Sequence, residues 1–239
     1  MSDETRHASH DGGVRPYVTR WSRLLALAAF FVLVVSGTGC GGGSDTPSDE
    51  PADSDAATIV QIAEMNYGVF EPFTVEGSGE QFIDLPVEAL AGIVTAASEG
   101  TDEFAIVGLD SGGQPVDLLV RDPGPYSGTT FYADDVSGKV AKLRVVGEAW
   151  TVTVSPVSLA PEFVGSATGT GDAVLLYSET ASALQLSHDG KREFVVSMDG
   201  NGQGIVVEAE GAYEALAEVR PGPAILLITA DGSWSIEAR

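Results

Sequence analysis

Four short segments of this chain recur in the same order further along it, and this duplication constrains the fold more than any other feature. The recurring pairs are 77–80 with 169–172, 103–106 with 193–196, 113–116 with 202–205, and 143–150 with 227–234. The spacing between equivalent positions shortens steadily from the first pair to the last, as happens when loops lose residues and strands keep theirs. The sequence therefore predicts two copies of one structural module.

Each copy is rich in aromatic and β-branched residues and is interrupted at short intervals by Gly, Pro or Asp-Gly, which is typical of a sandwich or barrel. In the first copy we expect strands at 81–85, 93–97, 103–109, 116–120, 129–133, 140–146 and 150–154. In the second copy we expect them at 173–177, 183–187, 193–198, 205–209, 213–219, 225–229 and 233–237. Apolar residues alternate along several of these segments, for example Trp150, Val152 and Val154, so one face of each strand should point inward.

About seven short antiparallel strands in about 80 residues fit one small β-sandwich. We therefore predict an all-β chain with two tandem antiparallel β-sandwich modules, jelly-roll or immunoglobulin-like, at 59–156 and 157–239. Modules that close on a Gly-x-x-Trp-x-Val-type strand resemble the β-sandwich repeats of secreted bacterial surface proteins, and this resemblance implies architecture only. The segment 59–62, ahead of the first copy, is interpreted as an edge strand.

The only cysteine, Cys40, stands where a secretion signal would end. A basic lead with Arg20 and Arg23 precedes an apolar run over residues 24–35, and small residues follow that run. A positive segment, a short apolar segment and small residues at the cut are the parts of a signal peptide. An uncleaved transmembrane anchor is the competing interpretation, but a span needs about 20 apolar residues, and this run is shorter.

The junction at Cys40 resembles the lipobox of bacterial lipoproteins. Thr38 and Gly39 match its two small positions and Cys40 matches the acylated position, whereas Gly37 departs from it because an aliphatic residue is usual there. The resemblance implies a signal peptide at 1–39 and lipid attachment at Cys40. It places the protein at the extracytoplasmic face of the cell membrane, held through a lipid anchor. A plain signal peptide remains the alternative.

Residues 40–58 carry the predicted lipidated cysteine and an acidic stretch rich in Ser, Pro and Ala. Such a composition cannot bury enough apolar area to fold, so we expect a flexible, disordered linker. From residue 40 onward the chain has 32 acidic and eight basic side chains, because the lead holds three of the 35 acidic and four of the 12 basic ones. This charge argues against nucleic acid as a partner. The expected partners are the membrane, through the lipid, and an envelope protein or a glycan.

The loop after the strand predicted at 193–198 has the spacing of a Ca²⁺-binding loop. Asp199, Asn201 and Gln203 occupy positions 1, 3 and 5, Gly204 position 6 and Glu210 position 12. The flanking segments are predicted strands, whereas such a loop joins two helices, so a Gly-rich hairpin turn is the favoured interpretation. No metal ligand is assigned, although a weak cation at 199–204 stays open.

His188 is the only histidine after Cys40, so a Ser–His–Asp triad would have to use it. The chain has no Gly-x-Ser-x-Gly elbow to supply the serine, and zinc needs three or four ligands. His188, Asp189 and Gly190 are therefore interpreted as a surface hairpin turn. The glycine-rich stretch 165–171 lacks a lysine and precedes a strand, so we interpret it as a linker and not as a phosphate cradle.

The residues thus assign no catalytic side chain and no cofactor. The favoured function is a lipid-anchored, non-enzymatic envelope protein with a binding or structural role. Two alternatives remain: a carbohydrate- or cation-binding module that assists an enzyme or transporter, and a hydrolase with an unrecognised site. An exposed row of aromatic side chains would favour glycan binding, and a cleft of carboxylates with raised pKa would favour an enzyme.

Overall fold

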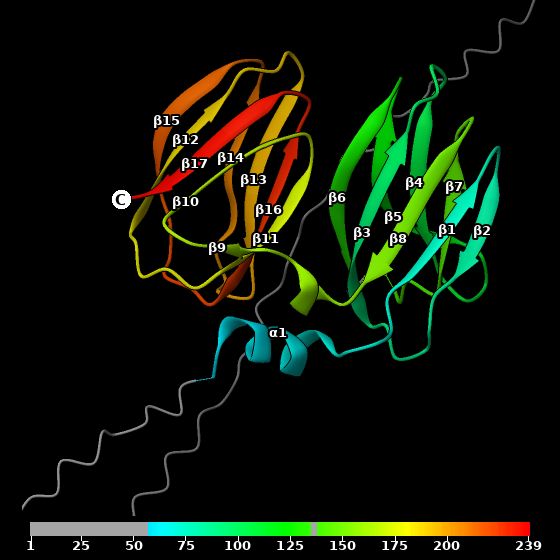
Figure 1. Ribbon diagram of the computed structural model, residues 1–239. Coiled ribbons are helices and arrows are strands. Elements are labelled where there is room, and N and C mark those ends of the chain that lie inside the picture. The colour runs from blue at the N-terminus through cyan, green and yellow to red at the C-terminus, as the bar shows by residue number, and fades with distance from the viewer. Residues whose placement is uncertain (1–56, 135–137) are drawn as a thin grey trace, which may run out of the picture. The chain divides into compact units, whose positions relative to one another are not determined.

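The computed structural model describes residues 57–134 and 138–239 of the chain (Figure 1). The predicted signal peptide at 1–39, the lipid-attachment residue Cys40 and the linker up to residue 56 lie outside the described residues. Within the described part, no helix is long and apolar enough to cross a membrane.

The fold is all-β, as predicted, and the described strands form four sheets. Strands between Phe73 and Ser155 build two four-stranded antiparallel sheets, ordered β1-β8-β3-β6 and β2-β7-β4-β5, which we call the first sandwich. Its strands are β1 (Phe73–Gly77), β2 (Gln81–Asp84), β3 (Ala91–Ser98), β4 (Phe104–Leu109), β5 (Pro115–Asp122), β6 (Tyr126–Ala133), β7 (Lys142–Val146) and β8 (Trp150–Ser155).

Strands between Glu162 and Ala238 build the other two sheets, ordered β10-β17-β12-β15 and β14-β13-β16-β11-β9, which we call the second sandwich. Its strands are β9 (Glu162–Phe163), β10 (Ser166–Thr170), β11 (Ala173–Tyr177), β12 (Ala183–His188), β13 (Glu193–Asp199), β14 (Gly204–Glu210), β15 (Tyr213–Glu218), β16 (Ala224–Ala230) and β17 (Ser233–Ala238). All pairs are antiparallel except β9 with β11.

The predicted duplication is present in the topology. Adding nine to each strand label of the first sandwich gives the order of the second, with β9 as an extra edge strand. Two sheets ordered 1-8-3-6 and 2-7-4-5 form an eight-stranded jelly roll, the double-sheet arrangement of two Greek keys. Each described copy therefore has eight repeated strands and not seven. The missed strands are β1 and β10, and β10 corrects the linker predicted at 165–171.

A glycine and a tryptophan explain why the segments at 77–80 and 169–172 recur. Gly77 pairs with Trp150 and Gly169 pairs with Trp234, and a Cβ at either glycine would run into the indole ring. The indole N–H groups donate to the carbonyls of Gly79 and Gly171, at 3.2 and 2.8 Å. Both tryptophans are buried, as predicted. The first glycine of each Gly-x-Gly thus makes room for the ring, and the second accepts its hydrogen bond.

Residues predicted as an edge strand at 59–62 instead begin helix α1 (Ile59–Tyr67). Thr58 caps the helix: its hydroxyl accepts from the N–H of Gln61, and the Gln61 side chain accepts from the N–H of Thr58. This capping box was readable in the sequence as Thr-x-x-Gln before an apolar segment, and it outweighs the β-branched residues that suggested a strand. The helix ends at Gly68, which has φ of 78°.

Each sandwich has its own apolar core, and a third cluster lies between them. The third cluster contains Ile59 and Ala63 of α1, Ile93 and Phe131 on the outer face of the first sandwich, and, from the second, Val174, Leu176 and Ile225. Val157 and Ala160, in and after the short 3₁₀ helix η1 (Val157–Leu159), and Ala91 of β3 also belong to it. The two sandwiches therefore share buried surface. The predicted domain boundary at 156/157 stays a prediction.

Candidate functional site

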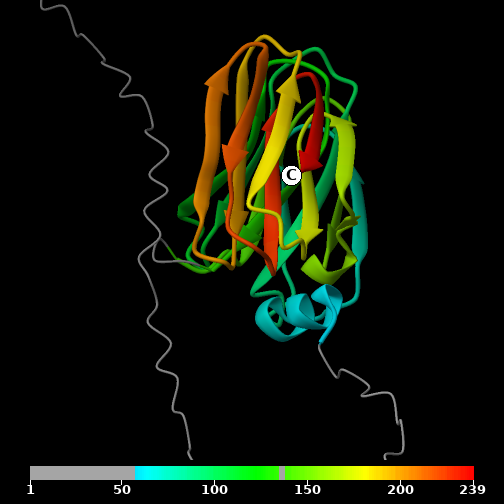
Figure 2. The ribbon, with the colours of Figure 1, turned by 90° about the vertical axis from the view of Figure 1, so that its left-hand side faces the viewer.

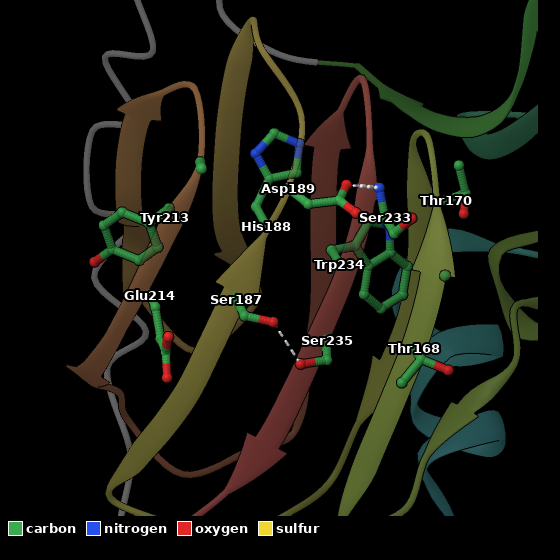
Figure 3. Close-up of a pocket in the computed structure, with 12 residues that line it drawn as sticks. Thr168, Thr170, Ser187, His188, Asp189, Tyr213, Glu214, Ser233, Trp234 and Ser235 are labelled. Carbon is green, nitrogen blue, oxygen red and sulfur yellow. Dashed lines mark hydrogen bonds between the residues drawn. The ribbon is translucent and has the colours of Figure 1, made fainter.

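A shallow depression of about 730 Å³ lies on the outer face of the β10-β17-β12-β15 sheet (Figure 3). Its lining is polar because alternate residues of a strand point to opposite faces, so the face turned away from the core carries the polar ones. In β17, Trp234 and Ile236 enter the core while Ser233 and Ser235 face outward. The lining is consequently rich in hydroxyl groups, from Thr168, Thr170, Ser187, Ser233 and Ser235. We call this feature the hydroxyl depression.

One row of outward side chains crosses the depression with a residue from each strand. The register aligns Thr168 with Ser235, Ser235 with Ser187, and Ser187 with Glu214. The Ser187 and Ser235 hydroxyls are hydrogen-bonded to each other at 2.7 Å, as Figure 3 shows. The row ends at the exposed carboxylate of Glu214. It offers a flat set of hydrogen-bonding groups with one negative charge.

The first sandwich carries a hydroxyl row on its corresponding sheet. Thr74, Thr153, Thr95 and Thr129 are aligned across β1, β8, β3 and β6, and two hydrogen bonds join them in pairs, Thr74 with Thr153 and Thr95 with Thr129. Neither row was predicted from the sequence. The signal was present, because Thr-x-Thr in β8 and Ser-x-Ser in β17 alternate with apolar residues on the opposite face.

His188 is not part of a surface turn, which corrects the prediction: it ends strand β12 and its side chain is fully buried. The ring stacks on Phe194 at 4.6 Å between centroids, and Nδ1 lies 3.0 Å from the carbonyl oxygen of Gly211. Because a carbonyl only accepts, Nδ1 carries the proton in that hydrogen bond. Nε2 lies 3.5 Å from Oδ1 of Asp231. The neighbouring Ser187 points to the other face of the sheet.

Asp231 and Asp122 hold Arg192 at the turn beside His188. The guanidinium lies 2.6 Å from Asp122 of the first sandwich and 3.4 Å from Asp231. Burial raises the pKa of the Asp231 carboxyl, but backbone hydrogen bonds from Arg192 and Lys191 and the charge of Arg192 outweigh it, so that pKa is lowered. Arg192 has a raised pKa, chiefly from its hydrogen bond to Asp122. This side chain thus links the two sandwiches electrostatically.

Tyr126 and Asp172 make a second polar link between the sandwiches. The Tyr126 hydroxyl donates to Asp172 at 2.9 Å, and the N–H of Ala230 donates to the other carboxylate oxygen at 2.9 Å. Burial, followed by the nearby carboxylate of Asp172, raises the pKa of the Tyr126 hydroxyl. Burial also raises the pKa of Asp172, against the two hydrogen bonds that lower it. A buried carboxylate with both oxygens occupied is a structural link, with no free oxygen for a general base.

The loop with Ca²⁺-type spacing is the hairpin turn between β13 and β14. Asn201 donates to the carbonyls of Arg220 and Pro221, and its own oxygen accepts from the N–H of Gln203. Oδ2 of Asp199 accepts from the hydroxyl of Tyr67 at 3.3 Å. Glu210, the twelfth position, pairs with Glu193 at the far end of β14. Its carboxylate therefore belongs to the opposite end of the sandwich from this turn.

The comparisons with known proteins do not name a family. No family model matches the chain, and no curated protein matches it. Among solved structures, a conserved protein of unknown function from Pseudomonas aeruginosa aligns with 10% identity and a TM-score of 0.23, over 70% of this chain and 80% of that one. The regulatory subunit of a cAMP-independent protein kinase A from Trypanosoma brucei aligns with 12% identity and a TM-score of 0.21, over 70% and 74%. At such TM-scores the likeness carries no argument about function.

Proposed function

We propose that this chain is a lipid-anchored, non-enzymatic binding protein of the bacterial envelope, attached through Cys40. The observation that supports binding is the hydroxyl depression, where Thr168, Ser235 and Ser187 form a flat row that leads to Glu214. A broad shallow surface of this kind suits contact with an extended polar partner. An open depression of this kind does not enclose a reactant and does not strengthen electrostatic interactions by excluding water, as a closed active site does.

The positions of the candidate catalytic groups favour binding over hydrolysis. A nucleophilic serine needs a base within about 2.6–3.2 Å. In the part of the chain that the structure describes, Ser187 and Ser235 are bonded to each other, while the ring of His188 lies in the core against Phe194. Asp172, whose carboxyl pKa is raised, is buried at the contact between the sandwiches and is not among the residues that line the depression.

A carbohydrate-binding module is the second candidate, because hydroxyl and carboxylate groups are the partners that sugar hydroxyls use. Exposed aromatic rings on this sheet would have strengthened that candidate. The aromatic side chains of its described strands, Trp234 and Tyr213, pack instead against the core of the second sandwich. A glycan would therefore be held by hydrogen bonds to the row and not by stacking on rings.

The anchor is tested by Cys40→Ser in a bacterial host with lipoprotein processing. We expect the native chain to carry a diacylglyceryl mass on Cys40 and to sediment with membranes. The variant should accumulate as precursor or appear in the medium. Membrane retention of a normally cleaved variant would contradict the lipid anchor.

The binding surface is tested with Ser235→Ala combined with Glu214→Gln, using purified cell-wall glycan as the probe in a sedimentation assay. Loss of two polar contacts should weaken retention about fivefold to thirtyfold. Thr153→Val on the first sandwich is the matched control and should leave retention unchanged. Equal retention of all three chains would rule out the hydroxyl depression as the glycan surface and leave an envelope protein as its partner.

A further inference from the structure

Several exposed apolar side chains gather at one end of the first sandwich, whereas Phe82 and Leu118 lie along its strands β2 and β5. Among the described residues ten large hydrophobic side chains are exposed, and five of them lie in or beside the connections around α1. These five are Met65, Val69, Val87, Leu90 and Leu159, with exposed fractions between 50% and 82%. We call this group the apolar end. Figures 1 and 2 show α1 at the same end of the strands in both views.

Strand register places these residues at one end of the sandwich. Phe73 pairs with Val154, Ile93 pairs with Ser155, and Ala91 pairs with Ala133, so β1, β8, β3 and β6 have those termini together. The connection 85–90 reaches this end from β2, and a Cβ on Gly68 would lie 3.6 Å from the carbonyl oxygen of Glu88. The residues after α1 and the connection before β3 are therefore in contact.

The opposite end of the first sandwich has a different surface. Its connections, 78–80, 99–103, 123–125 and 147–149, contain no exposed large hydrophobic residue in the described structure. They carry carboxylates, from Glu80, Glu99, Asp102, Glu103 and Glu148, with no exposed large apolar side chain in the same described connections. The two ends of one sandwich thus differ in their exposed apolar side chains. An exposed apolar group of this kind marks a contact surface, whereas the opposite end is suited to water.

We infer that the apolar end contacts the phospholipid surface to which Cys40 is attached, an inference that rests on the proposed anchor. The described chain begins directly ahead of α1, at the apolar end, so the anchor leads to this end of the sandwich and not to the acidic one. The 17 residues between Cys40 and Thr58 can reach at most roughly 60 Å, which keeps the sandwich near the bilayer.

Because the chain is already tethered, a weak apolar contact with lipid is sufficient to orient it at the membrane. A chain already held at the membrane experiences the lipid surface at a high effective concentration, so partition of a few side chains is enough to orient it. Lys139, whose ammonium donates to the carbonyl of Val87 at 3.0 Å, places a positive group where lipid phosphates lie. Glu64, Glu71 and Glu88 lie at the same end and disfavour strongly anionic lipid. Zwitterionic phospholipid is therefore the expected surface.

The test uses the full acylated chain in phosphatidylcholine vesicles that contain lipids brominated near the headgroup. Acylation blocks the Cys40 thiol, so an introduced cysteine is the one site for a fluorescent label. Leu159→Cys and Val87→Cys report on the apolar end, and Ala149→Cys, on an exposed residue of the opposite end, is the matched control. We expect about twofold lower fluorescence at the first two positions, because side chains that lie about 5–10 Å into the interface meet the bromine atoms. No quenching is expected at Ala149→Cys.

A second variant separates orientation from attachment. In a Val87→Glu/Leu159→Glu background, a label at Met65→Cys should lose its quenching while the chain still floats with the vesicles. Flotation of the Leu159→Cys and Val87→Cys chains with no quenching, or equal quenching at both ends, would overturn the inference and leave the proposed function intact. Absence of diacylglyceryl mass on Cys40 would overturn the proposed function together with the inference.

Discussion

The two sandwiches share one strand order and one buried tryptophan, but they differ where the third strand of each copy ends. β3 ends in Ser98 and β12 ends in His188, and each of these residues pairs with the tryptophan of its own sandwich. Each also pairs with the first residue of the neighbouring strand, Tyr126 or Tyr213. The backbone positions are equivalent, and only the side chains change.

The tyrosine beside Ser98 and the tyrosine beside His188 pack differently. In the first sandwich Tyr126 stacks on Phe104 at 5.4 Å, and its hydroxyl reaches Asp172 of the second sandwich. In the second, His188 stacks on Phe194 at 4.6 Å, and Tyr213 is tilted against the same ring at 5.8 Å. A duplicated framework therefore keeps its core and changes its ends. The end of the first sandwich that carries Tyr126 contacts the second sandwich. The equivalent end of the second sandwich, with His188 and Tyr213, packs against its own Phe194.

The largest effect is expected where the copies are alike. Trp150→Ala and Trp234→Ala should each lower the free energy of unfolding by about 3–5 kcal/mol, because each removes a large buried ring and leaves a cavity. Urea denaturation of the chain from residue 40 onward, which lacks Trp21, is followed by the fluorescence of the one tryptophan left in each variant. The outward neighbours supply controls: Thr151→Ala and Ser235→Ala should change it by less than about 0.5 kcal/mol. Clearly unequal losses for the two tryptophans would break the equivalence of the cores.

His188→Ala should cost about 2 kcal/mol, because the imidazole fills space against Phe194 and satisfies the Gly211 carbonyl. Ser98→Ala at the equivalent position should be nearly neutral, since the Ser98 hydroxyl is buried without a hydrogen-bond partner in the described structure. Thermal and urea unfolding of both variants measure the difference. Similar losses would show that the histidine has no packing role of its own.

Tyr126→Phe should cost about 1–2 kcal/mol, because it removes a hydrogen bond from the buried carboxylate of Asp172. Tyr213→Phe is the matched change in the second sandwich and should lie within about 0.5 kcal/mol of the native chain. Calorimetry tests both, and the Tyr126 variant should also weaken the coupling between the two sandwiches. If Tyr213→Phe lowered stability as much as Tyr126→Phe, the hydrogen bond from Tyr126 to Asp172 would not explain the loss.

The smallest effects concern the pH dependence of the free energy of unfolding, to which Asp172 and Asp231 should contribute with opposite sign. The folded-state pKa of Asp172 is raised, so the folded chain binds the proton more tightly and stability falls as pH rises from the ordinary value to the raised one. Asp172→Asn should remove that fall. The pKa of Asp231 is lowered, so its contribution is present at neutral pH and is lost as pH falls through the lowered value. Asp231→Asn should therefore destabilise at neutral pH and not in strong acid.

These pH profiles are measured as the free energy of unfolding between strong acid and neutrality for the native chain and both variants. Asn at position 172 can still accept from Ala230 and donate to the Tyr126 oxygen, so the variant tests the charge and not the contact. Parallel profiles for the two variants would refute the opposite signs.

Much of the β-structure was predictable because it follows from local pattern. Aromatic and β-branched segments bounded by Gly, Pro or Asp-Gly located the fourteen predicted strands, and the repeated Gly-x-Gly and Trp segments predicted the duplication and both buried tryptophans. The errors were also local in origin. The strand β10 has few large apolar residues, so its sequence looked like a linker. The helix α1 begins with β-branched residues that favour a strand, whereas its Thr-x-x-Gln capping box favours a helix.

The candidate site could not be predicted in the same way, because it depends on which residues become neighbours. Ser187, Ser235 and Thr168 are far apart in the sequence, and only the order β10-β17-β12-β15 aligns them. His188 was expected in a surface turn because the sequence offers it neither a nucleophile elbow nor enough ligands for a zinc site. The space against Phe194 and the Gly211 carbonyl decided otherwise.

The sequence by itself determined the all-β class, the two copies and the inward tryptophans, because alternation and repetition are properties of the chain alone. Tertiary structure decided the jelly-roll order, the contact of Arg192 and Asp172 with the first sandwich, and the gathering of exposed apolar side chains at one end. These features require strands from distant segments to pair, and strand pairing depends on the side chains of every neighbour at once.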